Sequence, residues 1–245
     1  MFEAIAHFFY LTLYQPLFNA LVLLYQYIPG HDFGIAIIFL TLFIRLILFP
    51  ISLQAVHSQK SLQKLQPKVQ ELQKKYKNDK EREAKEILEL YKTEKINPFS
   101  TIFLALIQIP ILIALYNVFW HGLNPKELTS LYSFVASPGQ IDAIFISLID
   151  LSKPNFILAI LSGLTQYWQT KMLLPKEKSG KNTDFSQIMQ NQMVYFMPIF
   201  TVIILIGLPS ALGLYWTASG LFSIIQQYII LRKNDNNGTT GIKQN

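Results

Sequence analysis

Five stretches of the chain are long and apolar enough to cross a lipid bilayer, and this feature restricts the possible fold more than any other. A hydrocarbon core roughly 30 Å thick needs about 20 mostly apolar residues in a helix. The composition agrees, because 51% of the residues are hydrophobic and only 15% are charged. We predict an all-α integral membrane protein with transmembrane helices at residues 34–53, 98–120, 155–173, 192–208 and 212–231.

The basic residues lie almost entirely on one side of these spans. Residues 54–97 contain eleven Lys or Arg, residues 171–191 contain four and the tail after 231 contains three, against two on the other side. Loops rich in Lys and Arg stay in the cytosol. We therefore expect a multi-pass protein with its N-terminus outside and its C-terminus inside. The net charge of +6 is explained by this topology, and we predict no nucleic-acid recognition. The first 44 residues contain no Lys or Arg, unlike a signal or transit peptide.

Residues 1–33 form an outer segment in this arrangement and contain a further apolar run at 6–28. The polar residues of this run recur at spacings of 3, 4 and 7, so they share one helical face: Thr12, Gln15, Asn19 and Gln26. Such a helix is expected to lie in the membrane interface. A sixth span is the alternative, but it would move the N-terminus to the other side or reverse all the other helices against the charge count.

The connection at 54–97 is predicted to be a separate cytosolic module. Its apolar residues keep a helical spacing that "KNDK" at 77–80 interrupts, which predicts a hairpin of two amphipathic helices. The hairpin could be a short self-packed coiled coil or an arm that contacts incoming chains. The residues expected on the two packing faces are Leu62, Leu65, Val69, Leu72 and Tyr76, then Ala84, Ile87, Leu88 and Tyr91.

Three further connections complete the predicted arrangement. They are an outer segment at 121–154, a cytosolic loop at 174–191 and a short cytosolic tail at 232–245. The small residues of "GLPSALG" at 207–213 predict a tight turn, so the last two spans should be antiparallel neighbours.

Arg45 stands inside the first apolar run, "FLTLFIRLILFPIS" (39–52), with only apolar neighbours for three residues on each side. At 1.5 Å per residue, it is roughly 10 Å from the inner end of its helix. Its side chain could extend partway to the inner headgroups, which is the plain structural interpretation. However, no predicted span contains Asp or Glu, and an unpaired charge inside a membrane is by default a functional site.

Polar residues form stripes on four of the five predicted helices. One stripe could hold helices together, but several would each be costly against lipid, so they indicate a shared polar cavity. We predict a hydrated groove, open to lipid, that binds its substrate through Arg45, Thr41, Gln108, Thr165, Gln169, Trp216, Ser219 and Ser223. We expect no catalytic residue, metal or cofactor, because the histidines lie outside the spans and the chain has no Cys and no G-x-S-x-G motif.

Several stretches taken together resemble the YidC-type membrane protein insertases, in the short form without a large outer domain. No single stretch is diagnostic, but their order across residues 8–231 is the same. The strongest are "GIAIIFLTLFIRLILFPISLQAVHSQKSLQKLQPKVQELQKKYKND" (34–79), "ELYKTEKINPF" (89–99), "IQIPILIALY" (107–116) and "LGLYWTASGLFSIIQQYII" (212–230). The resemblance implies five core helices, an outer interfacial helix, a cytosolic hairpin and a polar groove with an arginine where Arg45 stands.

The resemblance also implies a function. Such a protein is a bacterial inner membrane insertase and chaperone that passes hydrophilic segments of nascent membrane proteins through its groove, releases their apolar helices into the lipid bilayer and hydrolyses no nucleotide. We expect a functional monomer. Contact with the Sec translocon or the ribosome is left open, because the tail lacks the long basic extension of some members. The alternatives are a small-solute transporter, for which we find no internal repeat, and a membrane assembly scaffold.

Overall fold

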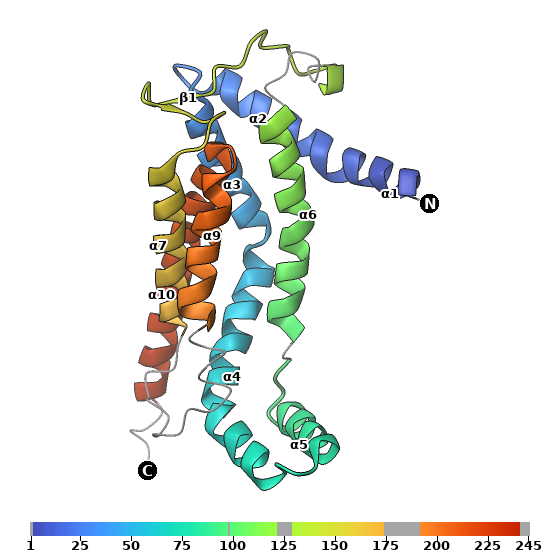
Figure 1. Cartoon of the computed structure of the whole chain (residues 1–245), viewed down its shortest axis with the longest axis vertical. Coiled ribbons are helices and arrows are strands. Elements are labelled where there is room, and N and C mark those ends of the chain that lie inside the picture. The colour runs from blue at the N-terminus through green and yellow to red at the C-terminus, as the bar shows by residue number, and fades with distance from the viewer. Residues whose placement is uncertain (1, 98, 122–128, 174–191, 241–245) are drawn as a thin grey trace.

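The computed structural model describes residues 2–97, 99–121, 129–173 and 192–240, and most of them are helical (Figure 1). This confirms the all-α prediction, apart from one small antiparallel ribbon. We call the end of the bundle with that ribbon the ribbon end, and the opposite end, with the α4–α5 turn, the hairpin end. The elements are α1 (Phe2–Phe9), the π-helical η1 (Tyr10–Tyr14), α2 (Gln15–Tyr27), α3 (Phe33–Ile47), α4 (Phe49–Lys75), α5 (Lys80–Thr93), α6 (Phe99–His121), β1 (Ile144–Phe145), β2 (Ile149–Asp150), α7 (Phe156–Met172), η3 (Gln192–Phe196), α9 (Met197–Ile206) and α10 (Ser210–Thr240).

Length and hydropathy alone mark only part of this bundle as membrane-spanning. Within the described residues, the stretch Glu3–Tyr27 is long and apolar enough to cross a bilayer, and α3 with α4 qualifies if the two form one bent span. Shorter apolar helices occupy Leu106–Trp120 and Gln192–Ile206. The number of spans therefore stays a prediction.

α1, η1 and α2 cross the ribbon end of the bundle at a steep angle instead of running along it (Figure 1). The polar face predicted on this segment contacts the main chain of the outer segment that was predicted at 121–154. Asn19 Nδ2 donates to Ser130 O at 3.2 Å, and Asn19 Oδ1 accepts from Tyr132 N at 2.7 Å. Gln15 Nε2 also donates to Ser130 O, at 3.1 Å. Buried amides need such partners, so this polar face is partly covered by protein.

The first predicted span is not one straight helix. α3 and α4 meet at a 66° bend beside Leu48. Pro50, in the first turn of α4, has no N–H for the carbonyl four residues earlier, and its ring crowds that carbonyl. α4 then continues without a break to Lys75, so the first half of the predicted hairpin extends the span.

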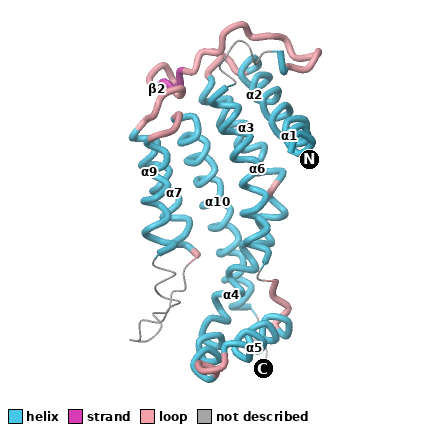
Figure 2. Tube along the Cα trace, turned by 45° about the vertical axis from the view of Figure 1, so that its right-hand side comes forward, coloured by secondary structure: helices cyan, strands magenta, loops and turns pink. Residues whose placement is uncertain are grey.

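α5 packs against α4 at the hairpin end (Figure 2). It begins in the predicted break, where Asp79 Oδ1 accepts a capping hydrogen bond from Arg82 N at 3.0 Å. Ile87 and Tyr91 are partly buried as expected. The predicted packing face is wrong at two positions, because Ala84 is exposed and Leu88 is 50% exposed. Among the helices that the structure describes, α5 packs mainly against α4, which leaves part of its apolar face uncovered.

α7 packs against both α9 and α10 (Figure 2). Its approach to α10 requires Gly220, since a Cβ there would lie 2.6 Å from Thr165 Oγ1. The turn predicted at 207–213 takes up only residues 207–209 and joins α9 to α10, which begins at Ser210. α7 contacts both helices more extensively than they contact each other. α10 extends to Thr240, into the predicted tail, while the predicted loop at 174–191 lies outside the described residues.

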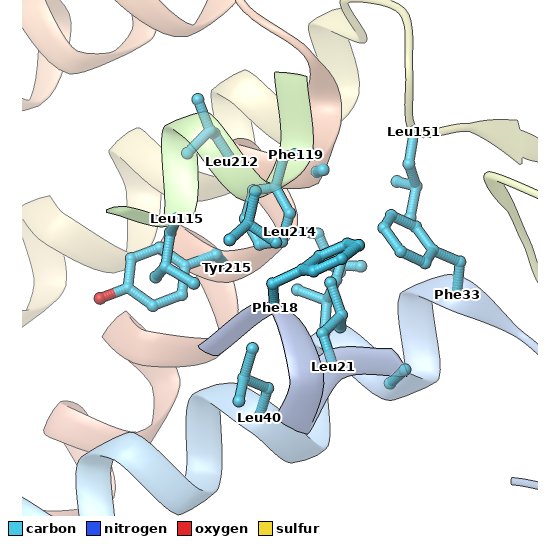
Figure 3. Close-up of a cluster of buried hydrophobic side chains, with 14 of the residues drawn as sticks. Phe18, Leu21, Phe33, Leu40, Leu115, Phe119, Leu151, Leu212, Leu214 and Tyr215 are labelled. Atoms are coloured by element: carbon cyan, nitrogen blue, oxygen red, sulfur yellow. The ribbon is translucent and has the colours of Figure 1, made fainter. Parts of the chain in front are cut away.

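The apolar core lies at the ribbon end (Figure 3). The outer segment closes this end, with β1 and β2 pairing antiparallel, a ribbon too short to show a strand pattern in the sequence. Lys153 O accepts from Ser210 N at 2.9 Å, and Leu151 O accepts from Ala211 N at 3.1 Å, so this segment caps α10. The core side chains labelled in Figure 3 are Phe18, Leu21, Phe33, Leu40, Leu115, Phe119, Leu151, Leu212, Leu214 and Tyr215.

Candidate functional site

A cavity of about 120 Å³ lies between α3, α6, α7 and α10, on the hairpin side of the apolar core. A space of this size has room for several water molecules. Most of its lining residues carry polar groups, which is unusual inside a bundle whose other buried residues are mainly apolar. The lining residues are Arg45, Gln108, Leu112, Thr165, Gln166, Gln169, Tyr215, Trp216, Ser219 and Gly220.

The partly buried Arg45 guanidinium is held through a single hydroxyl. Its Nε donates to Ser219 Oγ at 2.7 Å, and its Nη2 donates to the same oxygen. In the part of the chain that the structure describes, no carboxylate lies within 4.0 Å of Arg45, and Nη1 makes no hydrogen bond. A guanidinium has five N–H donors, so Arg45 keeps donors for a further partner.

Tyr215 marks the boundary between the core and the cavity. Its side chain is 3% exposed and belongs to the apolar core, and Figure 3 shows its hydroxyl pointing away from that cluster. The hydroxyl accepts a hydrogen bond from Gln108 Nε2. One residue therefore closes the core on one side and presents a polar group to the cavity on the other.

α7 supplies three polar residues to the cavity. Thr165 Oγ1 donates to Ser162 O at 2.9 Å, which ties it to its own helix. Gln166 Oε1 is buried, yet it accepts no hydrogen bond from any described residue. Buried side-chain oxygens nearly always have a partner, so Gln166 keeps an acceptor for a further hydrogen bond.

A second polar layer lies further toward the hairpin end. Gln226 Nε2 donates to Ser52 Oγ at 2.7 Å. Gln227 is 2% exposed, and its Oε1 is the other buried side-chain oxygen without a partner among the described residues. Gln227 does not line the cavity. Below this layer, Val56, Leu173 and Ile230 form a small apolar cluster.

The structure brings six of the eight predicted groove residues to the cavity and leaves two out. Thr41 is 1% exposed and donates to Ile37 O at 2.6 Å, and Ser223 donates to Ser219 O at 3.0 Å. Both hydroxyls bond to the carbonyl four residues back. A polar stripe in a sequence cannot separate such a residue from one that lines a cavity. The six are Arg45, Gln108, Thr165, Gln169, Trp216 and Ser219.

Four lining residues were not predicted. Gln166 belongs to the polar stripe of α7, so the stripe alone could have identified it. Gly220 lines the cavity because α7 and α10 approach closely there, and Tyr215 because its long side chain reaches past the core. Leu112 is apolar and gives no signal in the sequence.

Residues 23–237 match a protein family described as the 60Kd inner membrane protein. The chain belongs to this family. A protein from Fusobacterium nucleatum named membrane protein insertase YidC is 34% identical over 202 residues, which are 82% of this chain and 87% of the relative. The protein of the same name from Clostridium tetani is 37% identical over 198 residues, 81% of either chain. The predicted resemblance to YidC-type insertases is therefore confirmed.

Members of the 60Kd inner membrane protein family differ in length. The membrane protein insertase YidC of Geobacter metallireducens is 32% identical over 216 residues, which are 88% of this chain but only 36% of that protein. The present chain therefore spans little more than a third of such longer relatives, whereas it covers most of the Fusobacterium and Clostridium proteins.

Proposed function

We propose that this chain is a membrane protein insertase that passes hydrophilic segments of nascent membrane proteins through the polar cavity and releases their apolar helices into the bilayer. One observation carries the proposal: Arg45, with no carboxylate partner among the described residues, faces a polar cavity inside a bundle whose buried residues are mainly apolar. Membership of a family whose relatives are named insertases supports it.

Arg45 would offer a counter-charge to acidic residues of a passing client. At an effective dielectric constant near 20 and about 4 Å, an opposite charge gains roughly 4 kcal/mol. Inserting an Asp at the centre of a membrane helix costs about 2.5–3.5 kcal/mol. Because the two values are similar, a client carboxylate is largely compensated beside Arg45 but is not trapped there, which suits transfer.

The apolar helix of the client would leave along α7 and α10. Both helices expose large apolar side chains, among them Leu164 and Trp168 on α7 and Leu221 and Ile225 on α10. Apolar surface that leaves water gains roughly 25 cal/mol per Å². This gain drives release without a nucleotide.

We place the ribbon end outside and the hairpin end in the cytosol, because the α4–α5 hairpin carries most of the basic residues. In this orientation, α1 and α2 lie in the outer interface, crosswise to the bundle as Figure 1 draws them. The mechanism needs only one copy of the chain, so we propose a functional monomer. Contacts with a Sec channel or a ribosome are not required by it.

The test is insertion of a single-span client with an acidic translocated segment into liposomes that contain only this protein. We expect the wild-type chain to insert it, and Arg45→Glu to lower the initial rate at least about tenfold, since repulsion replaces attraction. Arg232→Glu, in an exposed position near the end of α10, is the matched control and should leave the rate unchanged. Equal rates for wild type and Arg45→Glu would remove the role of Arg45.

A further inference from the structure

The residues that line the cavity hold both a hydrogen-bond donor and a hydrogen-bond acceptor without partners among the described residues. Arg45 Nη1 is the donor, and Gln166 Oε1 is the acceptor. Arg45 and Gln166 come from different helices, α3 and α7, and both residues line the same space of about 120 Å³. A ligand that fits this cavity should satisfy both groups at once.

The chemistry of the two groups narrows the choice of ligand. An ionised carboxylate only accepts hydrogen bonds, so it would pair with Arg45 but leave Gln166 Oε1 unsatisfied. An ammonium group only donates, and Arg45 would repel it. A peptide unit carries one C=O acceptor and one N–H donor and complements both groups.

We propose that the cavity binds the main chain of the client, with a client carbonyl accepting from Arg45 and a client N–H donating to Gln166 Oε1. This inference rests on the proposed function and names the part of the client that is recognised. Every residue of a client presents the same two groups, whereas acidic side chains occur only occasionally. Main-chain recognition would therefore let one cavity handle hydrophilic segments of any sequence.

The other polar groups of the cavity suit this role. Gln108 and Gln169 carry amides, which can both donate and accept as the chain moves past. Ser219 already accepts two hydrogen bonds from Arg45, which fixes the guanidinium in place. In the region that the structure describes, Arg45 is the only charged residue of the lining, so no second charge selects for particular client side chains.

The experiment compares two clients in liposomes that contain only this protein. One has a translocated segment of Gly, Ser and Asn, and the other has the same segment with two Asp residues. In each client, single peptide bonds of the segment are replaced by esters, which removes the N–H donor and weakens the carbonyl acceptor. The protein variants are Gln166→Met, which removes the acceptor at similar size, and Gln227→Met as a matched control. Gln227 is also a buried glutamine with an unpaired oxygen, but it lies outside the cavity.

We expect Gln166→Met to lower the initial insertion rate about three- to tenfold for the neutral and the acidic client alike, the size of one lost hydrogen bond. Gln227→Met should leave both rates unchanged. In wild type, an ester at the right position should cause a similar loss, and combining it with Gln166→Met should add little, because both changes remove the same bond.

Two results would overturn the inference alone. Gln166→Met could leave both rates unchanged while wild type inserts the acidic client much faster than the neutral one, in which case side-chain charge is what the cavity recognises. Ester clients could be inserted at the normal rate, in which case water serves these polar groups throughout. The ester arm needs no protein variant, so a misfolded Gln166→Met would not obscure the answer. If wild-type protein inserts neither client, the proposed function fails as well.

Discussion

The ribbon half and the hairpin half of the bundle share the helices α3, α6, α7 and α10 but differ in how completely their buried polar side chains are paired. In the ribbon half, Ser162 Oγ contacts Leu158 O, Gly213 O and Thr217 Oγ1 at 2.8–3.1 Å. In the hairpin half, Gln166 and Gln227 hold the two buried side-chain oxygens that lack partners among the described residues. On α7, buried polar groups therefore change from fully paired to partly unpaired within about one helical turn.

The polar residues along α7, from Ser162 to Gln169, therefore have two different roles. Ser162 lies at a helix–helix contact, where small residues bring α7 and α10 close enough for hydroxyls to meet. Gln166 and Gln169 follow along the same helix and line the cavity. The first part of the stripe holds the bundle together, and the second leaves polar groups available for a ligand.

The two halves should differ most in how much a single truncation destabilises the protein. Phe18 is 1% exposed in the apolar core (Figure 3), so we expect Phe18→Ala to lower the free energy of unfolding by about 3–5 kcal/mol. Gln169→Ala in the cavity should change it by no more than about 0.5 kcal/mol, because the cavity is already loosely filled. Unfolding in mixed micelles, followed by circular dichroism, measures both. Equal losses would mean that the two halves are packed alike.

The next effect concerns water access. The chain contains no cysteine, so single cysteines can report on each half. We expect a cysteine at position 169 to react with a polar thiol reagent at least about tenfold faster than one at position 162, two turns earlier on α7, because Ser162 is fully buried and Gln169 lines the cavity. Slow reaction at both positions would show that the cavity is sealed from water.

The sequence predicted the helical character of the chain and much of the cavity, because both depend on local composition. Apolar runs locate helices, and the missing carboxylates drew attention to Arg45. Thr41 and Ser223 do not line the cavity, and the sequence does not reveal this, because a hydroxyl that bonds to its own helix has the same spacing as one that lines a cavity. That distinction depends on where the neighbouring helix lies, which no stripe reveals.

Contacts between segments that are far apart in the chain could not be predicted from the sequence either. Asn19 pairs with Ser130 and Tyr132, more than a hundred residues away, so no local pattern predicts that protein covers its polar face. The bend beside Leu48 interrupts a continuous apolar run, and only Pro50 marks it. Leu88 differs in the opposite sense: it belongs to a regular apolar pattern that predicts burial, yet it is exposed because no neighbouring described residue covers it.

The smallest effect tests whether charge contributes to closing the ribbon end. The Lys153 ammonium lies 2.8 Å from Asp150 Oδ2 and, by this hydrogen bond, lowers the pKa of the Asp150 carboxyl, while Asp150 raises the pKa of Lys153. The stabilisation from Asp150 is present above the carboxyl's ordinary pKa of 3.8 and is lost as the pH falls through the lower folded value. That from Lys153 is present below its ordinary pKa of 10.5 and is lost as the pH rises through the higher folded value.

Both side chains are substantially exposed, 77% for Lys153 and 37% for Asp150, so solvent screens the pair and its contribution should be small. We expect the free energy of unfolding of Asp150→Asn to depend only slightly less on pH than that of wild type between pH 5 and pH 2. Both proteins are measured in the same micelles. The capping bonds from Ser210 N and Ala211 N to the outer segment use main-chain carbonyls and survive the substitution. A large loss of stability at neutral pH in Asp150→Asn would instead mean that this ion pair, and not the backbone capping of α10, holds the ribbon end closed.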